Sequence, residues 1–414
     1  MTLLSPAYAA ALADGVYDVN KNPRMDPNDR AMLLRCEPDF SIGRPADAGL
    51  FARGTSGAPP GGFALLGAVP GGQAIIDMFS PVASDFGYVG IGNRLWQDHM
   101  IIVTRGTMGA QGVSNDWISN YNVGLQPGPS GLPVHAGFNR IWGGFRAFIL
   151  EAVQRYRPDH IHCVGHSLGG ALASLNAELL IDRGHAVTLY TFGAPRVGTL
   201  PFATKLSVAL RGRIKRVYHP ADPVPMIPLL PFLHAPLSSG IRLSSSPGSL
   251  VDPSAHDMVQ SYEAGVIGKS WAQLEAAHTS FNDFQVDSWL QKAAKQRGGY
   301  IMRSAALLER ISRGLSRLVQ KAAIYVIGSG LSSAATATLT ALDFIAWLLV
   351  RAAELGETIR AEIDGLVNAI FGFLGRVGNS VVTLTRAALR WVLDLLYGFL
   401  AGTASNAMDR LRRW

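Results

Sequence analysis

Residues 162–176 read HCVGHSLGGALASLN and contain the pattern Gly-x-Ser-x-Gly at 165–169. The residues at 161–164 are typical of a short strand, and those at 171–180 are typical of a helix. A glycine-flanked serine between a strand and a helix lies on a sharp turn that lifts its hydroxyl above the sheet edge. The alternative is an ordinary glycine-rich turn, which the strand and the helix on either side make less favourable. We therefore predict that Ser167 is a nucleophile.

The composition limits the class of protein. A chain of 414 residues can bury a large core and form two domains. The net charge is +7, but no run of Lys and Arg marks a nucleic-acid site, so the surplus favours anionic lipid and excludes nucleic acid as a partner. The only cysteines, Cys36 and Cys163, are too few for a disulfide framework and indicate synthesis in a reducing compartment. The first 20 residues lack the basic region of a secretory signal, so we expect export, if any, by a non-Sec route.

Strand patterns alternate with helix patterns between residues 99 and 222. This alternation predicts an α/β fold with a mainly parallel sheet. The expected strands are 86–91, 99–103, 161–164, 186–192 and 214–218, and the expected helices are 5–20, 137–156, 171–180 and 200–210. Asp252 and Pro253 predict the N-cap and first turn of a further helix that holds His256 and Tyr262.

A serine needs a histidine to accept its proton and an acid to orient that histidine. In α/β-hydrolase-like folds these partners follow in the order Ser, Asp or Glu, His. Asp222 comes directly after a predicted strand, and His256 follows it, so we predict these two as acid and base. His278 is the main rival base, while Asp252 and Asp257 flank His256 as alternative acids.

The tetrahedral intermediate of an acyl transfer needs two backbone N–H donors. The residue after the nucleophile, Leu168, supplies one, and the strand-end turn Arg105-Gly106-Thr107 supplies the other through Thr107. An ordinary Arg-Gly turn is the alternative for this segment. We see no spacing of metal ligands, and the chemistry requires no cofactor.

Taken together, these residues resemble the class 3 (fungal-type) triacylglycerol lipases. The resemblance implies an α/β-hydrolase-like serine carboxylester hydrolase acting on lipids, with Ser167, Asp222 and His256 as triad. It also implies Thr107 and Leu168 as oxyanion donors and a lid at about 108–130. The segments that carry it are 104–107 (TRGT) with 116–117 (DW), 134–138 (VHAGF), 165–170 (GHSLGG), 193–198 (GAPRVG), 222–225 (DPVP), and His256 with Tyr262. His219 departs from the family, which more often has Asn before the acid.

The composition changes after residue 298, and the resemblance does not cover the rest of the chain. Residues 301–414 hold 13 basic and 8 acidic residues in apolar helical patterns. We predict a catalytic domain at 1–298 and an apolar, basic α-helical domain at 299–414 that binds a membrane or a partner. The 21 uncharged residues at 322–342 are long enough to span a bilayer, and four arginines precede them on an amphipathic helix. Inward packing as a helical bundle, surface binding and membrane spanning all remain open.

The resulting hypothesis is a phospholipase A or lipase that cleaves acyl esters of glycerolipids. A leaderless class 3 lipase with such a helical region is also similar to bacterial lipase toxins delivered by contact-dependent secretion. Expected partners are the lipid substrate and a membrane surface, with an immunity protein or a secretion chaperone as candidates. We expect synthesis in a bacterial cytoplasm and membrane association. The alternatives are a pore-forming, toxin-like protein that retains a lipase scaffold, and an esterase for soluble or polysaccharide-linked esters.

Overall fold

The computed structural model describes residues 2–21, 63–69, 86–92, 96–106, 124–237, 240–244, 249–277, 283–295, 300, 302–328, 341–376 and 384–411. The strands are β1 (Phe63–Val69), β2 (Gly87–Gly92), β3 (His99–Thr104), β4 (Leu125–Pro127), β5 (Pro133–His135), β6 (His160–His166), β7 (Val187–Phe192), β8 (Ile214–Tyr218) and β9 (Ile241–Arg242). The helices before residue 280 are α1 (Pro6–Lys21), α5 (Ala136–Gly143), α6 (Arg146–Tyr156), α7 (Leu168–Asp182), α8 (Leu200–Ala209), η2 (Val224–Met226), η3 (Pro253–His256), η4 (Met258–Glu263), α9 (Ala264–Val266) and α10 (Trp271–Ala276). Those after it are α11 (Asp283–Lys295), α12 (Ala305–Gly328), α13 (Ala341–Ala353), α14 (Glu357–Phe373) and α15 (Arg386–Leu411).

Seven of these strands form one sheet in the order β1-β2-β3-β6-β7-β8-β9. The pairs from β3 to β9 are parallel, and β1 and β2 continue the sheet as antiparallel strands. The fold class predicted from sequence, α/β with a mainly parallel sheet, is therefore confirmed. Parallel strands end at the same edge, so the segments that follow β3, β6, β7 and β8 meet there.

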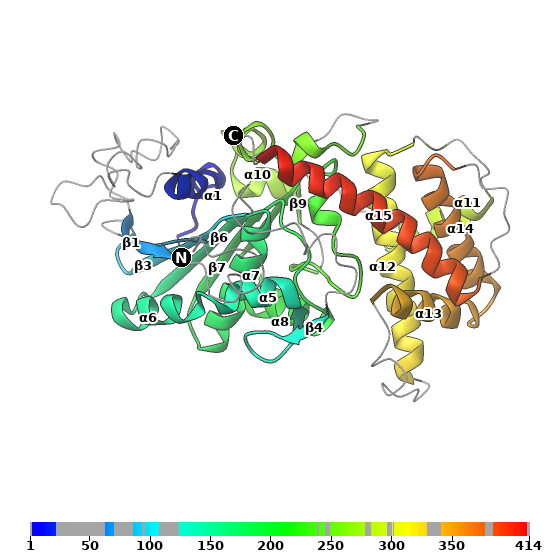
Figure 1. Ribbon diagram of the computed structural model, residues 1–414, viewed down its shortest axis with the longest axis horizontal. Coiled ribbons are helices and arrows are strands. Elements are labelled where there is room, and N and C mark those ends of the chain that lie inside the picture. Colours follow the sequence, from blue (N-terminus) through cyan, green and yellow to red (C-terminus); the bar gives the residue numbers. More distant parts are fainter. Residues whose placement is uncertain are drawn as a thin grey trace.

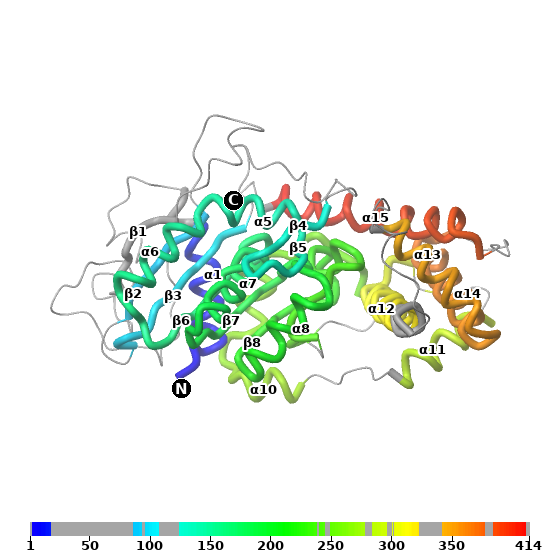
Figure 2. The backbone as a smooth tube through the Cα atoms, turned by 90° about the horizontal axis from the view of Figure 1, so that it is seen from below, coloured from blue at the N-terminus to red at the C-terminus, as the bar shows by residue number. Residues whose placement is uncertain are grey.

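The sheet separates two apolar layers, because side chains alternate between its faces. On β7, Leu189 belongs to the cluster that contains α5 to α8, while the next residue, Tyr190, belongs to the cluster that contains α1, η4 and α10. Figure 1 shows α1 and α10 above the sheet and α5, α6, α7 and α8 below it, and Figure 2 shows the same arrangement turned by 90°. Both faces of the central strands are thus buried, as is usual for parallel sheets.

Two predicted helices are each divided in the structure. The helix expected at 137–156 consists of α5 and α6, with a break at Gly144, whose N–H donates to the carbonyl of Ile141 at 3.2 Å. Two adjacent glycines at 143–144 have low helix propensity, which explains the break. The helix expected after Asp252 consists of η3 and η4, because Asp257 caps a second turn by accepting from the N–H of Gln260 at 2.6 Å.

Helices α11 to α14 and the N-terminal half of α15 form a helical part beside the sheet (Figure 1). Its buried residues are continuous with the cluster under α5 to α8, so the two parts share one core. Helix α11 lies before the boundary proposed at 298, yet it packs against α12 and α14. No helix in the described ranges is both long and apolar enough to cross a bilayer. The 322–342 stretch lies partly outside the described residues, since 329–340 are among those not described.

Helix α12 turns its apolar face inward. Leu308, Ile311, Leu315 and Leu318 on that face are all buried in the shared core. Its basic side instead bonds to neighbouring helices, as when Arg317 donates to Asp287 of α11 at 3.2 Å. Of the three arrangements left open for the sequence of α12, its described residues therefore adopt inward packing.

Candidate active site

Ser167 lies between β6 and α7, at the edge of the sheet where the parallel strands end. Its backbone has φ 59° and ψ −133°, a strained conformation for a residue other than glycine. The turn is held by a hydrogen bond from the Ser167 N–H to the carbonyl of Phe192 on β7, 2.9 Å long. A strand, a strained serine and a helix in immediate succession produce the turn expected from the sequence.

Glycine is required beside this serine because neighbouring backbone leaves no room for a side chain. A Cβ on Gly169 would overlap the carbonyl oxygen of Thr104, and one on Gly165 would overlap that of Gly169. The side chain of Thr104 closes the same contact by donating to the carbonyl of Gly169 at 2.6 Å. The end of β3 and the start of α7 are thus fixed against each other.

We expect Gly169→Ala to lower the free energy of unfolding by about 1–3 kcal/mol, because the added methyl group must displace backbone. Urea unfolding followed by circular dichroism measures the change. Gly143→Ala is the matched control, since a Cβ there meets nothing within 4 Å, and its effect is expected to stay within about 0.5 kcal/mol. Equal stability of the two variants would contradict the close packing of the turn.

The three residues predicted as nucleophile, acid and base lie in one hydrogen-bonded row. Asp222 Oδ2 accepts from His256 Nδ1 at 2.7 Å, and Ser167 Oγ lies 2.8 Å from His256 Nε2. The side chains come from the turn after β8, from the end of η3 and from the turn after β6. All three are fully buried. This geometry allows His256 to accept a proton from Ser167 while Asp222 fixes the imidazole tautomer.

The Asp222 carboxylate accepts two further hydrogen bonds. Tyr262 OH donates to Oδ2 at 2.5 Å, and the N–H of Val224 donates to Oδ1 at 2.8 Å. Burial, together with the neighbouring Asp222 carboxylate, raises the pKa of Tyr262 well above its usual value, so its hydroxyl stays a donor. The sequence placed Tyr262 on the helix predicted after Asp252 and in the family resemblance, but assigned it no role.

The rival residues have other partners. Asp252 accepts from the N–H of Ser254 at 2.9 Å, and Asp257 caps η4 through Gln260. Both carboxylates therefore act as helix caps, and it is Asp222 that bonds to His256. His278 lies outside the described residues.

Of the two predicted oxyanion donors, one is described. Leu168 is the first residue of α7, where a backbone N–H has no partner within the helix. Thr107 lies outside the described residues, as does 108–123 of the proposed lid. The remainder of the lid range, 124–130, contains β4 and a turn, in which Ser130 N–H donates to the buried Glu178 of α7 at 3.1 Å.

A second chain of hydrogen bonds connects the turn after β3 to His256. The N–H of Gly106 donates to Tyr17 OH at 3.1 Å, and Tyr17 OH lies 2.9 Å from His166 Nδ1. His166 Nε2 lies 3.0 Å from the backbone carbonyl of His256, which can only accept, so His166 carries its proton on Nε2. Burial, with His256 close by, holds the pKa of His166 well below its usual value, which keeps it neutral. Sequence reasoning missed both Tyr17 and His166 as positioning residues.

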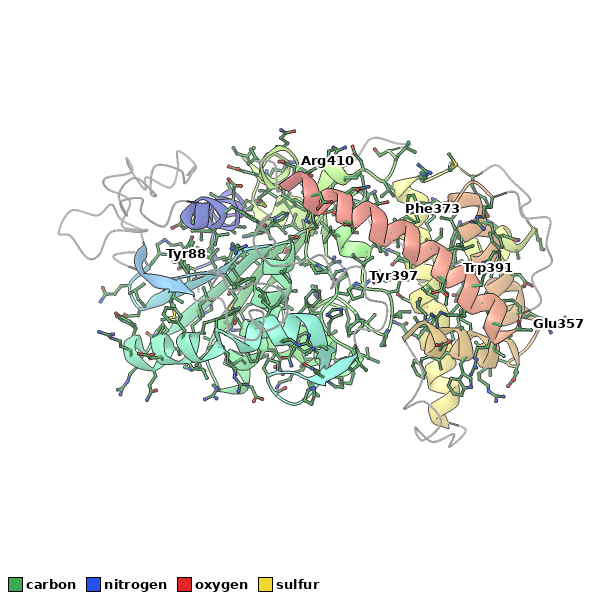
Figure 3. All side chains as sticks on the ribbon, in the orientation of Figure 1. Tyr88, Glu357, Phe373, Trp391, Tyr397 and Arg410 are labelled. Carbon is green, nitrogen blue, oxygen red and sulfur yellow. The ribbon has the colours of Figure 1, made fainter. Side chains whose placement is uncertain are left out.

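The row of three is covered by the last helix of the described chain. Sδ of Met408 on α15 lies 3.2 Å from Ser167 Oγ, and the side chain is fully buried. The same helix packs against η2 and η3, which flank Asp222 and hold His256. Figure 3 shows α15 crossing from the helical part, where Trp391 lies, to the part that contains the sheet, where Arg410 lies.

Within the described part of the chain, no group of three or more His, Cys, Asp or Glu side chains is placed to hold a metal ion.

Part of the chain is similar in sequence to a known protein family. Residues 101–232 match the family model described as Lipase (class 3), which confirms the resemblance seen in the sequence. The matched segment contains Ser167 and Asp222, whereas His256 and the helical part lie beyond it. Among solved structures, the chain is similar to a mono- and diacylglycerol lipase from Aspergillus oryzae, with 28% identity, 40% of this chain and 61% of that chain covered, and a TM-score of 0.34.

Three curated relatives illustrate the range of similar proteins. Secreted mono- and diacylglycerol lipase 1 of Fusarium solani is 33% identical over 154 residues, which are 36% of this chain and 45% of the relative. Phospholipase A1-II 1 of Oryza sativa is 27% identical over 198 residues, or 41% and 48%. Toxin TseL of Vibrio cholerae is 32% identical over 124 residues, or 30% and 19%. The chain thus spans less than half the length of each of these three.

Proposed function

We propose, from the class 3 lipase sequence at 101–232, that this protein is a serine carboxylic ester hydrolase acting on the acyl esters of glycerolipids. The observation that carries the proposal is the row Ser167–His256–Asp222, with distances of 2.8 and 2.7 Å, at the turn that the family sequence predicts. Lipase and phospholipase relatives support the same reaction class.

In the first half of the proposed reaction, Ser167 Oγ attacks the ester carbonyl carbon while His256 Nε2 accepts the serine proton. The N–H of Leu168 and a second donor at Thr107 stabilise the negative charge on the carbonyl oxygen. The carbon–oxygen bond to the glycerol moiety then breaks, and His256 returns its proton to the leaving alkoxide. The products of this half are an acyl-serine at Ser167 and a deacylated lipid.

In the second half, water attacks the acyl-serine while His256 takes a proton from it. When the second tetrahedral intermediate collapses, the bond between the acyl carbon and Ser167 Oγ breaks, His256 returns its proton to Oγ, and a fatty acid is released. The Asp222 carboxylate stabilises the imidazolium that forms in each half of the reaction. Tyr262 OH and the N–H of Val224 hold that carboxylate in place.

Phospholipid is the substrate we place first, ahead of acylglycerols. The surplus of positive charge on the chain, +7, favours an anionic surface. The relative named Toxin TseL supports a further proposal, that the protein acts as a toxin-like effector held in check by an immunity protein.

The test is the release of fatty acid from vesicles of anionic phospholipid, with leakage of an entrapped dye followed in the same tubes. We expect release and leakage together from the wild type and neither from Ser167→Ala. Vesicles of neutral phospholipid and emulsified diacylglycerol rank the substrates. Leakage without release by Ser167→Ala would favour the pore-forming alternative, and hydrolysis confined to soluble esters would favour the esterase alternative.

A further inference from the structure

A cluster of arginines lines a cavity of ≈ 230 Å³ between β8, the segment 225–237 and helix α12. Its walls include the guanidinium groups of Arg196, Arg216, Arg313 and Arg317, with Glu309 as the acidic side chain among them. This cavity has no lining residue in common with the Ser167–His256–Asp222 row. Four cations around one carboxylate leave an excess of positive charge.

The acidic side chains nearby do not neutralise all four arginines. Glu309 accepts from Arg313 at 3.4 Å and, through its other oxygen, from Arg242 at 3.2 Å. Arg317 bonds to Asp287 of α11 at 3.2 Å. These contacts engage Arg313 and Arg317, whereas neither of the other two arginines of the cavity forms an ion pair with a carboxylate of the described residues, although the charge of Glu309 acts on Arg216.

Arg196 and Arg216 are the two arginines of the cavity that form no ion pair with a carboxylate of the described residues. Arg196 donates to the carbonyls of Met226 and Pro228 and to Ser312 Oγ, at 2.6–3.0 Å, and is 7% exposed. Arg216 Nε is buried and has no hydrogen-bond partner among the described residues. The guanidinium of Arg216 instead lies 4.7 Å from the centre of the Tyr218 ring. Burial, and to a smaller extent the charge of Arg216, lower the pKa of Arg196 to about 10.

An apolar cavity adjoins the arginine cavity. It measures ≈ 620 Å³, and its lining shares Arg216, Pro236 and Leu237 with the first cavity. Four aliphatic side chains from the end of α8, β8 and β9 contribute to its walls, namely Val208, Leu210, Ile214 and Ile241, and the charged residues Arg211 and Glu275 also line it. Val208 and Leu237 in its lining are 72% and 41% exposed, so the apolar side chains extend to the molecular surface. One guanidinium therefore lies where a charged cavity meets an apolar one.

We propose that these two cavities form a binding site for a single-chain anionic amphiphile, whose carboxylate or phosphate contacts Arg216 and whose hydrocarbon chain occupies the apolar cavity. Charge-assisted hydrogen bonds from guanidinium to carboxylate or phosphate are the strongest polar contacts available to such a ligand. The ligand would supply the acceptor that Arg216 Nε lacks. Fatty acids and lysophospholipids share this chemistry.

Calorimetric titration of the full chain tests the site, with oleate and lysophosphatidylglycerol kept below their micellar concentrations. We expect Arg216→Gln to weaken binding of both by about tenfold or more, since one charge-assisted contact is lost. Arg183→Gln, on the exposed end of α7, is the matched control that removes the same charge elsewhere, and it should bind as the wild type does. Circular dichroism verifies that each variant is folded.

The binding affinities of the different ligands, and of wild type and Arg216→Gln, decide the outcome. Tighter binding of oleate than of monoolein supports the charge requirement, and tighter binding of oleate than of inorganic phosphate supports the chain requirement. A difference between oleate and lysophosphatidylglycerol distinguishes a carboxylate ligand from a phosphate ligand. Equal affinities of wild type and Arg216→Gln would overturn the proposal, as would equal affinities for phosphate and oleate.

A second and independent observation concerns α15, whose 26 residues extend over about 39 Å at 1.5 Å per residue. Its first half packs against α13 and α14, and its last turns pack against η2 and η3 beside the nucleophile. Met408 Sδ lies 3.2 Å from Ser167 Oγ, and both side chains are fully buried, so Met408 covers a hydroxyl that a reacting carbon must approach to about 3–3.5 Å. An ester cannot reach Ser167 while Met408 remains there.

We infer that α15 is an autoinhibitory helix, and that the enzyme acts only after the Met408 end of this helix is withdrawn. This inference rests on the proposed function, because it concerns access to the same serine. Helix α15 belongs to both parts of the molecule, so a ligand or surface that shifts the helical part also shifts Met408. The catalytic row itself needs no rearrangement, since its hydrogen bonds are already formed.

The rate at which a small fluorophosphonate labels Ser167, measured by intact mass in vesicle-free buffer, tests the inference. We expect Met408→Ala to be labelled about tenfold faster than the wild type or more, because the truncated side chain opens a path to Oγ. Met408→Leu preserves the covering volume and should be labelled as slowly as the wild type. Asn406→Ala, on the exposed side of the same turn, controls for changes in the helix.

Unfolding does not imitate this result, because rapid labelling requires an intact pair of Ser167 and His256. Equal labelling of wild type, Met408→Ala and Met408→Leu would overturn the autoinhibitory role, even if the protein hydrolyses lipid. If Met408→Ala is labelled faster but the protein hydrolyses none of the lipids tested, the inference that Met408 covers Ser167 stands, and the proposed function is rejected instead.

Discussion

Ser167→Ala is expected to lower the rate of fatty-acid release by about 10⁴–10⁶-fold, because no other group can form the acyl-serine. The loss should fall on kcat, since the substitution removes a reacting atom and leaves the lipid-binding surface unchanged. Release is measured on anionic phospholipid vesicles at saturating lipid. Any opening of the site around Ser167 by the lipid surface is then the same for both proteins.

Ser174→Ala is the matched control for this loss. Ser174 is a buried serine of the same helix, α7, and its hydroxyl donates to the carbonyl of Gly170 one turn earlier at 2.8 Å. We expect nearly full activity from this variant. Residual activity of Ser167→Ala above a few per cent of the wild type would show that another residue is the nucleophile.

Asp222→Asn is expected to lower kcat by about 10⁴-fold, although it changes only one atom of the side chain. The N–H of Val224, which can only donate, fixes the amide oxygen at the Oδ1 position. The amide nitrogen then faces His256 Nδ1, which must accept and therefore loses its proton. His256 would carry its proton on Nε2 instead, where it can no longer accept one from Ser167.

Two companion variants make this prediction specific. Tyr262→Phe removes one of the donors to Oδ2 but leaves the carboxylate charged, so we expect a loss of about tenfold, far below that of Asp222→Asn. Asp257→Asn keeps an oxygen that can cap η4 and removes only the charge, so it should leave the chemistry intact. A larger loss of kcat in Asp257→Asn than in Asp222→Asn would show that Asp222 is not the acid that orients His256.

The sequence alone predicted what depends on short segments. Gly165, Ser167 and Gly169 determine a strand–turn–helix unit within a few residues, because only glycine fits where backbone approaches backbone. The alternation of strand and helix patterns similarly determined the parallel sheet. Asp222 could be proposed because a parallel sheet brings the ends of successive strands to one edge, and His256 because it follows the acid in the order Ser, Asp, His.

Other local expectations were wrong in extent. The sequence suggested one helix at 137–156 and one after Asp252, and the structure divides both. Apolar periodicity continues across such breaks, because both halves face the same core. A glycine pair and a second capping aspartate end the hydrogen-bond ladder without disturbing that periodicity.

Only the tertiary structure decided which distant residues meet at the catalytic row. Met408 reaches Ser167 across 241 residues of sequence, and Tyr17 reaches His166 across 149. Neither contact has a local signal, because a methionine on a helix and a tyrosine on a helix are ordinary core residues. The direction in which α12 turns its leucines was equally undetermined, since an amphipathic helix buries its apolar face against protein or lipid alike. Spacing along the chain determines which elements form, whereas burial of their apolar faces against one another determines which side chains cover the site.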